Sequence, residues 1–459
     1  PGPPPAKPGG FTGTADEPME PTILARSDHP VSRKFIDPDT LRVLYRLKDE
    51  GHEAYLVGGA VRDILMGRHP KDFDIATSAR PHDLRKIFRN SRIVGRRFKI
   101  VHVFYGSKNI EVATLRSAVE PGDDPGDLYI DDDNQWGNLE SDAFRRDFSI
   151  NALYYDIRDF RIIDYTGGLK DLHDHRIRAI GDPHVRFQED PVRMLRAIKF
   201  AARYGYDLDA KTEPALEDLP EEIHKASRFR VTEEVFRILT QPNRERGLRM
   251  LDEFGFLDEI YGDWLDAIGD DGFEQVCDYF AAVDRRADDG IFYPLEVLIA
   301  GLFIPLLDSV DVSSDHYHKV SSRLAAEIGK VTRAMDLPRR LTAAAVDLLR
   351  GQYYLLFFHH RDKRVKKFVQ YANFDLVWRV HELAFGGLAE LEPIQEIWHH
   401  ARERLRRPIG GIVEAPDRRD IVSFRRTGGG RHPGGRGPRF TEADPDDWQG
   451  FDDSEAAEA

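Results

Sequence analysis

The sequence predicts an α+β protein in which a small head containing a β-sheet precedes a long, mostly α-helical region. Short strand-like runs fall between residues 54 and 116, whereas helical spacing of apolar residues dominates after about residue 180. The chain has 459 residues, of which 41% are hydrophobic and 32% charged, so it can bury more than one core. This composition excludes a fibrous or largely disordered chain.

Two further classes of protein are excluded by simple counts. The longest apolar run, Val297–Leu307, has eleven residues and contains Gly301 and Pro305, whereas a membrane-spanning helix needs about 20. The single cysteine, Cys277, excludes an intramolecular disulfide and a cysteine-rich zinc site. The N-terminal residues lack the apolar core of a secretory signal. We therefore expect no membrane span and a cytoplasmic location.

The negative net charge is distributed unevenly along the chain. The formal charge is −14, but residues 441–459 hold eight acids and no Lys or Arg. The preceding segment, 425–440, holds five arginines and six glycines without an acid. Such a segment cannot form a core and can follow the phosphates of RNA. Alternatively, the basic and acidic halves of a disordered tail, residues 402–459, screen one another.

The start of the chain alternates turn residues with short periodic runs. Residues 1–22 are rich in Pro and Gly, and we expect a disordered arm there. The following pattern predicts a helix at Leu41–Lys48, a strand at Ala54–Val57, a helix at Ala60–Met66, a strand at Asp72–Thr77, and a hairpin of two strands, Phe98–Tyr105 and Ile110–Arg116, joined by residues 106–109.

Asp72 and Asp74 form an acidic pair on one of these strands. Because one residue separates them, both carboxylates would project from the same face. Paired carboxylates can hold Mg²⁺ ions that activate a hydroxyl for attack at phosphorus. An isolated Asp-X-Asp is also common on solvated loops, so the pair alone does not identify a site.

Gly58 and Gly59 lie between a predicted strand and a predicted helix. Consecutive glycines allow backbone amides to approach a triphosphate, and the helix N-terminus adds positive potential. Arg62, on the first turn of that helix, is within reach of the same phosphates. The alternative is a tight structural turn with Arg62 paired to Asp63 or exposed to solvent.

Four segments in order resemble the class II tRNA nucleotidyltransferase and bacterial poly(A) polymerase superfamily. The first motif is formed by residues 55–63 together with 71–74, and the second by residues 145–152. Residues 164–168 resemble the hinge motif of the superfamily, and residues 189–196 its nucleotide-selecting motif. The resemblance implies a nucleotidyltransferase head with a mixed β-sheet, followed by a mostly α-helical neck and body.

The resemblance also implies roles for residues of the first two motifs. Asp72 and Asp74 would bind two Mg²⁺ ions, and Gly58, Gly59 and Arg62 would contact the triphosphate of ATP, the substrate.

In the second motif, Arg146 would steady the nucleotide and Asp147 would be the third active-site acid. Glu111 is the alternative third acid, because it lies on the hairpin strand and could face the metal ions. Otherwise Glu111 would form a salt bridge with Arg97 or Arg116.

The nucleotide-selecting motif would read the incoming base with protein side chains instead of a nucleic-acid template. By resemblance, Asp190 and Arg193 would bond to the Watson–Crick edge of the base, and Arg196 would share the helix face of Arg193. Asp190 and Pro191 also have an ordinary explanation as the cap and first residue of a helix. Arg193 could simply pair with Asp190 within that helix.

Three segments resemble the poly(A) polymerase branch of the superfamily: residues 32–34, 93–103 and 181–183. We therefore expect a template-independent RNA 3′-end polymerase that transfers AMP from ATP and releases pyrophosphate. The nearest alternative is a CCA-adding tRNA nucleotidyltransferase. A second alternative is a catalytically inactive adaptor that only binds RNA.

The expected domains are a head at 23–178, a neck at 179–240 and an RNA-binding body at 241–401. The body contains a basic run interleaved with aromatic residues, which suits contact with RNA phosphates and bases; alternatively, this run is a solvated helix face over core aromatics. Its basic residues are Arg361, Lys363, Arg364, Lys366 and Lys367, and its aromatic residues are Phe357, Phe358, Phe368 and Tyr371. His359 and His360 have no carboxylate at metal-ligand spacing, and we predict no metal site there.

Overall fold

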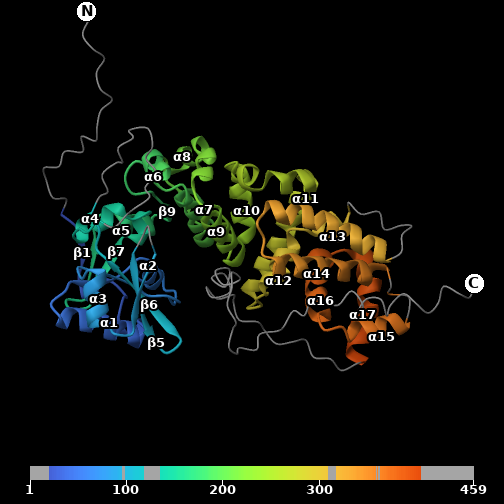
Figure 1. The fold of residues 1–459 in the computed structure, drawn as a ribbon, viewed down its shortest axis with the longest axis horizontal. Helices are drawn as coiled ribbons and strands as arrows, with labels where there is room; N and C mark the ends of the chain where they lie inside the picture. Colours follow the sequence, from blue (N-terminus) through green and yellow to red (C-terminus); the bar gives the residue numbers. More distant parts are fainter. Residues whose placement is uncertain are drawn as a thin grey trace, which may run out of the picture. The chain divides into compact units, whose positions relative to one another are not determined.

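The computed structural model describes residues 20–95, 99–117, 135–308, 317–357, 359 and 362–404. The chain divides into two compact units (Figure 1). The first, here called the head unit, comprises Pro1–Arg193 and Asp207–Ala215, and the second, the helical unit, comprises Met194–Tyr206 and Leu216–Ala459. The division passes through helices α7 (Val192–Tyr204) and α8 (Thr212–Asp218). It does not follow the expected boundaries at residues 178 and 240, which stay predictions.

The head unit contains both helices and strands. Its elements are β1 (Thr22–Leu24), η1 (Arg26–Asp28), η2 (Arg33–Phe35), α1 (Pro38–Asp49), β2 (Ala54–Val57), α2 (Gly59–Leu65), β3 (Asp74–Thr77), α3 (Pro81–Ile87), β4 (Ser91–Val94), β5 (Ile100–Tyr105), β6 (Lys108–Thr114), α4 (Leu139–Arg145), η3 (Ser149–Asn151), β7 (Leu153–Asp156), β8 (Arg161–Asp164), α5 (Gly168–His173), β9 (Arg176–Ile177), α6 (Pro183–Glu189), β10 (Asp207–Leu208) and the start of α8 (Thr212–Asp218).

Eight strands of the head unit form one sheet in the order β1-β8-β7-β2-β3-β6-β5-β4. The pair β3 and β6 is parallel and the other neighbours are antiparallel, so the sheet is mixed, as predicted. The predicted hairpin is confirmed by the pairing of Tyr105 with Lys108. The β2 prediction matches at both ends, whereas β1, β4, β7 and β8 had not been predicted.

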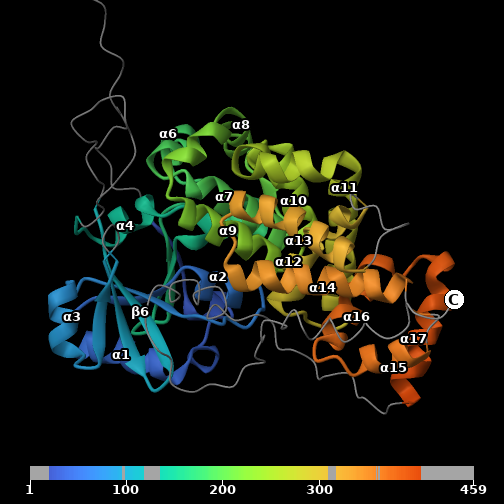
Figure 2. The same ribbon diagram turned by 45° about the vertical axis from the view of Figure 1, so that its right-hand side comes forward.

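Helices cover both faces of this sheet. Successive side chains of a strand point to opposite faces, so each strand contributes to two cores. Leu56 and Ile75 belong to the core that contains residues of α1, α2 and α3. Their neighbours Val57 and Ala76 belong to a second core, closed by Leu139 and Ala143 of α4. Figure 2 gives a second view of the sheet with α1 and α3. The face covered by α4 is called the α4 face below.

The helical unit confirms the prediction of a mostly α-helical second half. Its elements are α7 (Val192–Tyr204), η4 (Pro220–Lys225), α9 (Arg228–Thr240), α10 (Arg244–Glu253), α11 (Phe256–Asp288), α12 (Leu295–Gly301), η5 (Ile304–Leu307), α13 (Tyr317–Ala334), α14 (Arg339–Phe357), α15 (Asp362–Val369), α16 (Phe374–Phe385), η6 (Ala389–Leu391) and α17 (Glu392–Arg404).

Large buried aromatic side chains hold these helices together. The indole N–H of Trp264 donates to the carbonyl of Leu302 at 3.0 Å, and that of Trp398 donates to the carbonyl of Leu355 at 3.0 Å. Each bond satisfies the polar atom of a side chain that is otherwise buried in apolar surroundings. None of the helices in the described ranges combines the length and apolar character needed to cross a lipid bilayer.

The described part of the chain starts before the predicted end of the N-terminal arm and continues past the predicted start of the C-terminal tail. Thr22 already pairs with Asp164 in the sheet, so the arm cannot extend through residue 22. At the other end, Arg402 is buried and belongs to α17, so the expected tail boundary at 402 was too early. The Arg/Gly-rich and acidic segments lie outside the described residues.

Candidate active site

The turn after β2 brings the two glycines of the first motif against the second motif. Gly58 has φ +70° and ψ −131°, a conformation that favours glycine. A Cβ atom at Gly58 would lie 3.7 Å from the carbonyl oxygen of Asn151 and 3.8 Å from Nη1 of Arg146. The predicted strand, glycine turn and helix are therefore confirmed, with α2 starting at Gly59 instead of Ala60.

The acidic pair lies at the start of β3, next to this turn. Asp74 is the first residue of the strand and pairs with Val57 of β2. Asp72 lies before the strand and is exposed, so the prediction that β3 begins at Asp72 was wrong. The ladder between β2 and β3 stops at Asp74, because its partner Val57 is the last residue of β2 and the chain turns at Gly58 into α2.

Asp74 also pairs with Glu111, on the parallel neighbour β6. Paired residues on adjacent strands project to the same face of a sheet. Ala76, two residues after Asp74, belongs to the core beneath α4, so the carboxylates of Asp74 and Glu111 both lie on the α4 face. Nε2 of His102 lies 3.8 Å from Oε1 of Glu111. Arg97, one of the salt-bridge partners considered for Glu111, lies outside the described residues.

These acids supply ligands of the type that Mg²⁺ prefers. Within the described part of the chain, no group of three or more His, Cys, Asp or Glu side chains is arranged to hold a metal ion. Mg²⁺, however, is commonly held by one or two carboxylates together with substrate phosphates and water. Asp72 and Asp74, whose side chains carry only oxygen donors, fit that kind of site.

Arg62 is buried beneath the glycine turn and bound to two neighbouring side chains. Nε and Nη2 donate to Oδ1 of Asp63 at 2.9 and 2.8 Å, and Nη1 donates to Oδ1 of Asn151. The pairing with Asp63 is the structural alternative considered from the sequence. The contact with Asn151 was not foreseen, although Asn151 lies within the second motif.

Arg146 is held in place by Asp142 and Tyr154. Nε donates to the carboxylate of Asp142 at 3.1 Å and to the hydroxyl of Tyr154 at 2.9 Å, and this hydroxyl donates to Asp142 at 2.7 Å. Burial lowers the pKa of Arg146, but Tyr154 and Asp142 more than offset this and raise it above its ordinary value. The guanidinium therefore stays charged beside Gly58.

Asp147 faces its own segment of chain. Its Oδ1 accepts a bond from the backbone N–H of Phe148 at 2.8 Å and one from Nδ2 of Asn151 at 3.1 Å. Asn151 thus connects Asp147 to Arg62. These bonds join Asp147 to the network around the glycine turn, and Glu111 shares a strand register with Asp74. Which of the two is the third acid stays a prediction.

The nucleotide-selecting motif lies at the junction of α6 and α7. Asp190 is buried, follows the last residue of α6 and accepts the backbone N–H of Arg193 at 2.9 Å through its carbonyl. Helix α7 starts at Val192. The guanidinium of Arg193 bonds to Glu189 at 3.0 Å.

Arg196 is three residues further along α7, in the helical unit. Its Nη1 lies 3.7 Å from Oε1 of Glu234, and its guanidinium stands over the ring of Phe200 at 5.4 Å. Arg193 and Arg196 therefore pair with different carboxylates, and a shared role of the two in nucleotide selection stays a prediction.

Arginines are concentrated around the second motif of the head unit. Burial and the nearby guanidinium groups of Arg116, Arg186 and Arg193 lower the pKa of Arg145 to about 9. Burial and Arg193 likewise lower the pKa of Arg186 to about 10, against the opposing effects of Glu189 and Asp147. A local excess of positive charge of this kind favours a bound polyanion.

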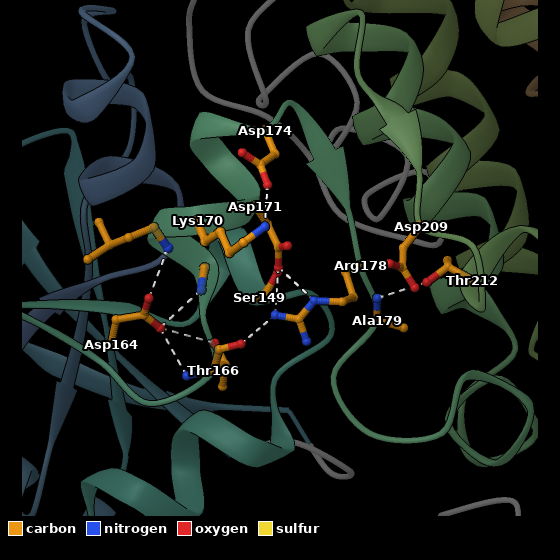
Figure 3. A network of polar contacts seen from close by, with 12 residues as sticks. Ser149, Asp164, Thr166, Lys170, Asp171, Asp174, Arg178, Ala179, Asp209 and Thr212 are labelled. Carbon is orange, nitrogen blue, oxygen red and sulfur yellow. Dashed lines mark hydrogen bonds and ion pairs between the residues drawn. The ribbon is translucent and has the colours of Figure 1, made fainter. Parts of the chain in front are cut away.

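The hinge motif begins with an acid that caps a helix. Asp164 accepts hydrogen bonds from the backbone N–H groups of Thr166, Gly168 and Leu169 at 2.9, 3.1 and 2.9 Å (Figure 3). These bonds satisfy donors at the N-terminus of α5 that have no partner within the helix. The local sequence therefore explains the start of α5.

A buried network ties the hinge motif to the second motif. The carboxylate of Asp171 accepts from the hydroxyl of Ser149 at 2.5 Å and from Nε of Arg178 at 2.8 Å, and Arg178 also donates to the carbonyl of Thr166 at 2.5 Å (Figure 3). Ser149 begins η3, which also contains Asn151. Asp171 and Arg178 were not identified from the sequence, because they lie outside the recognised motifs.

In the helical unit, the aromatic residues of the basic run have different surroundings, since Phe357 is exposed. Phe368 is fully buried and packs against Tyr354, with ring centroids 4.3 Å apart, so it is not an exposed stacking surface. Lys363, Lys366 and Lys367 lie on the exposed side of α15. Arg361, Phe358 and His360 lie outside the described residues.

Comparison with known families gives two matches. The model described as "Poly A polymerase head domain" matches residues 54–178. The model described as "Probable RNA and SrmB- binding site of polymerase A" matches residues 205–264.

Individual relatives extend this similarity over most of the chain. Poly(A) polymerase I of Salmonella typhimurium is 35% identical over 399 residues, which cover 82% of this chain and 85% of that protein. The CCA-adding enzyme of Lactobacillus helveticus is 40% identical over 210 residues, 45% of this chain and 51% of that protein. Among solved structures, the Bacillus stearothermophilus CCA-adding enzyme in complex with CTP matches with a TM-score of 0.61 and 26% identity, covering 86% of this chain and 90% of that one.

Proposed function

The chain belongs to the poly(A) polymerase family, whose members add nucleotides to RNA, and from this premise we propose that it extends RNA 3′ ends with AMP taken from ATP. The reaction needs no nucleic-acid template and releases pyrophosphate. The observation that carries this proposal is the extent of the sequence match: sequence similarity to Poly(A) polymerase I covers 82% of the chain, whereas sequence similarity to the CCA-adding enzyme of Lactobacillus helveticus covers 45%. The cytoplasmic location also stays a prediction.

The acids of the site would hold the metal ions on which this chemistry depends. Two Mg²⁺ ions bound by Asp72 and Asp74 would supply charge neutralisation at the α-phosphate and a lower pKa for the attacking 3′-hydroxyl. Glu111 supports this assignment as a third acid because it shares the register and the sheet face of Asp74. In this proposal, the sheet holds these carboxylates in fixed positions before substrate arrives.

The glycine turn and its arginines would bind the triphosphate. Gly58 and Gly59 lack side chains, so phosphates can approach the backbone amides at the start of α2. Arg146 is held by Asp142, and its Nη1 lies 3.8 Å from the position that a Cβ atom of Gly58 would take. Arg62 would support this surface through Asn151, and would reach the phosphates directly by releasing one of its present contacts.

The base would be selected by Asp190 and Arg193. An aspartate accepts hydrogen bonds and an arginine donates them, so the pair can match one arrangement of donors and acceptors on a base edge. Both residues belong to the head unit, together with the acids and the glycine turn. Selection by a fixed pair of side chains would explain how one nucleotide is added repeatedly without a template.

The principal alternative is addition of CCA to tRNA, favoured by the identity of 40% with a CCA-adding enzyme over 210 residues. We expect purified protein to add many adenylates to a generic RNA and to use CTP poorly. The measurement is incorporation of each labelled nucleotide on two primers, a generic RNA and a tRNA trimmed before its CCA. Addition of three nucleotides including C to the tRNA alone would refute polyadenylation. An inactive adaptor is no longer an alternative, since the family consists of enzymes.

A separate test concerns the third acid. We expect Glu111→Gln to lower kcat by about a hundredfold or more, because it removes a charge beside Asp74 at the reacting phosphate. Asp147→Asn should have a smaller effect on kcat and should mainly raise KM for ATP, since its bonds go to the network around the glycine turn. Single-turnover and steady-state kinetics separate these effects. A larger loss of kcat in Asp147→Asn than in Glu111→Gln would identify Asp147 as the third acid.

A further inference from the structure

Arg186, on α6, connects two motifs that lie about forty residues apart in the sequence. Its Nη2 donates to the carbonyl oxygens of Arg145 and Arg146 at 2.6 and 3.0 Å. Its Nη1 donates to Oε2 of Glu189 at 2.6 Å. The side chain is 14% exposed.

A second set of bonds continues from Arg186 to the base-selecting arginine. Oε2 of Glu189 also accepts from Nη1 of Arg193 at 3.0 Å, and the same Nη1 donates to the carbonyl of Arg186 at 2.8 Å. Among the described residues, the side-chain hydrogen bonds of Arg193 are therefore all made through Nη1. Nε and Nη2 remain available to a ligand.

The geometry of a guanidinium makes this connection rigid. Its donors lie in one plane and at fixed angles, so contacts on both sides of the group fix the distance between the groups that accept them. Here the acceptors are the backbone at Arg145 and Arg146 on one side and the carboxylate of Glu189 on the other. Burying Arg186 beside Arg193 is electrostatically costly, and Glu189 offsets the cost by bonding to both.

We propose that Arg186 is a positioning residue, which fixes the base-reading donors of Arg193 relative to the triphosphate-binding arginine, Arg146. The inference rests on the proposed roles of Arg146 and Arg193. In this arrangement, the base must be read at a set distance from the phosphates. If that distance varies, the preference for one base falls more than the affinity for the triphosphate, which every nucleotide shares.

Arg186→Lys tests the inference. Lysine keeps the charge but cannot reach acceptors on both sides at once. We expect the ratio of kcat/KM for ATP to that for CTP to fall about tenfold, the effect of one charge-assisted hydrogen bond. A purely structural role would lower both values equally and leave the ratio unchanged, which would overturn the proposal.

Arg178→Lys is the matched control. Arg178 also bonds to one carboxylate and one backbone carbonyl in the head unit, those of Asp171 and Thr166, but it has no contact with Arg193. Arg178→Lys should keep the wild-type ratio of kcat/KM for ATP to that for CTP, even if both values fall. An equal fall of the ratio in both variants would overturn a specific role for Arg186.

If Arg186→Lys does not fold, Glu189→Gln provides the same test, because it removes the charge that Arg186 and Arg193 share while keeping an acceptor oxygen. An unchanged ratio in that variant would overturn the proposal.

The wild-type protein tests the proposed function separately. A wild type that adds both C and A to trimmed tRNA would refute polyadenylation, and the ratio between those two nucleotides would still show whether Arg186 acts on selection.

Discussion

Replacing Asp74 or Asp72 with alanine is expected to abolish nucleotide addition. Each substitution removes oxygen ligands from the proposed metal site, and a bound metal ion supplies several kcal/mol of transition-state stabilisation, so the rate should fall by a factor of about 10³ or more. Asp72 is exposed, and Asp74 is half-buried as the first residue of β3. Neither change should therefore prevent folding. The measurement is single-nucleotide incorporation on an RNA primer over a range of Mg²⁺ concentrations.

Asp83→Ala is the control for this experiment. Asp83 is a partly exposed acid of the head unit, paired with Lys86 at 3.0 Å on α3, and its loss should leave activity at the wild-type level. Circular dichroism and thermal unfolding would establish that all three variants are folded. A folded Asp72→Ala or Asp74→Ala variant that retained a tenth of wild-type activity would contradict the assignment of these acids.

The largest expected effect on stability comes from Glu234, in the helical unit. Glu234 is buried and pairs with the buried Lys199 and with Arg237, whose Nη1 lies 2.5 Å from Oε1. Glu234→Gln leaves Lys199 buried without a counter-charge. Removing one partner of a buried ion pair typically costs about 3–5 kcal/mol, so we expect a loss of that size in the free energy of unfolding, measured with urea.

The same pair predicts how stability depends on pH. Burial raises the pKa of Glu234, but Lys199, Arg196 and Arg237 outweigh it and hold the pKa at about 2. Since the unfolded chain binds this proton near pH 4.5, the contribution of Glu234 is complete above that pH and is lost as the pH falls toward 2. Wild type should therefore lose more stability over this range than Glu234→Gln does.

Glu274→Gln is the control, because Glu274 forms an exposed pair with Arg249 at 2.9 Å. Exposed pairs contribute little, so its effect should be much smaller. If Glu234→Gln unfolded at the same urea concentration as wild type, the buried pair would not stabilise the protein.

The strands that could be predicted are those with a clear local signal. Ala54–Val57 is an apolar run that ends at two glycines, and the hairpin of β5 and β6 has a turn sequence between two apolar runs. Leu153–Asp156 was not identified because all four of its residues are buried, including an aspartate, so no alternation marks it. Burial on both faces depends on the helices that cover the sheet, and those helices come from other parts of the chain.

The candidate site could be proposed from the sequence as a set of residues but not as an arrangement. Asp72, Asp74, Gly58 and Arg62 are recognisable because metal and phosphate chemistry requires those residue types in a local pattern. The pairing of Asp74 with Glu111 depends on β3 lying parallel to β6, which no local pattern specifies.

Residue types and their local spacing were enough to predict an α+β head, a helical second half, and the acids and glycines typical of a nucleotidyltransferase. These properties depend on residue type and on spacing within a few turns of chain. The contacts between distant residues, such as Arg62 with Asn151 and Arg186 with the backbone of Arg146, are known only from the folded chain. Such contacts join segments that are far apart in the sequence, and they form because the sheet and its helices bring those segments together as they bury their apolar faces.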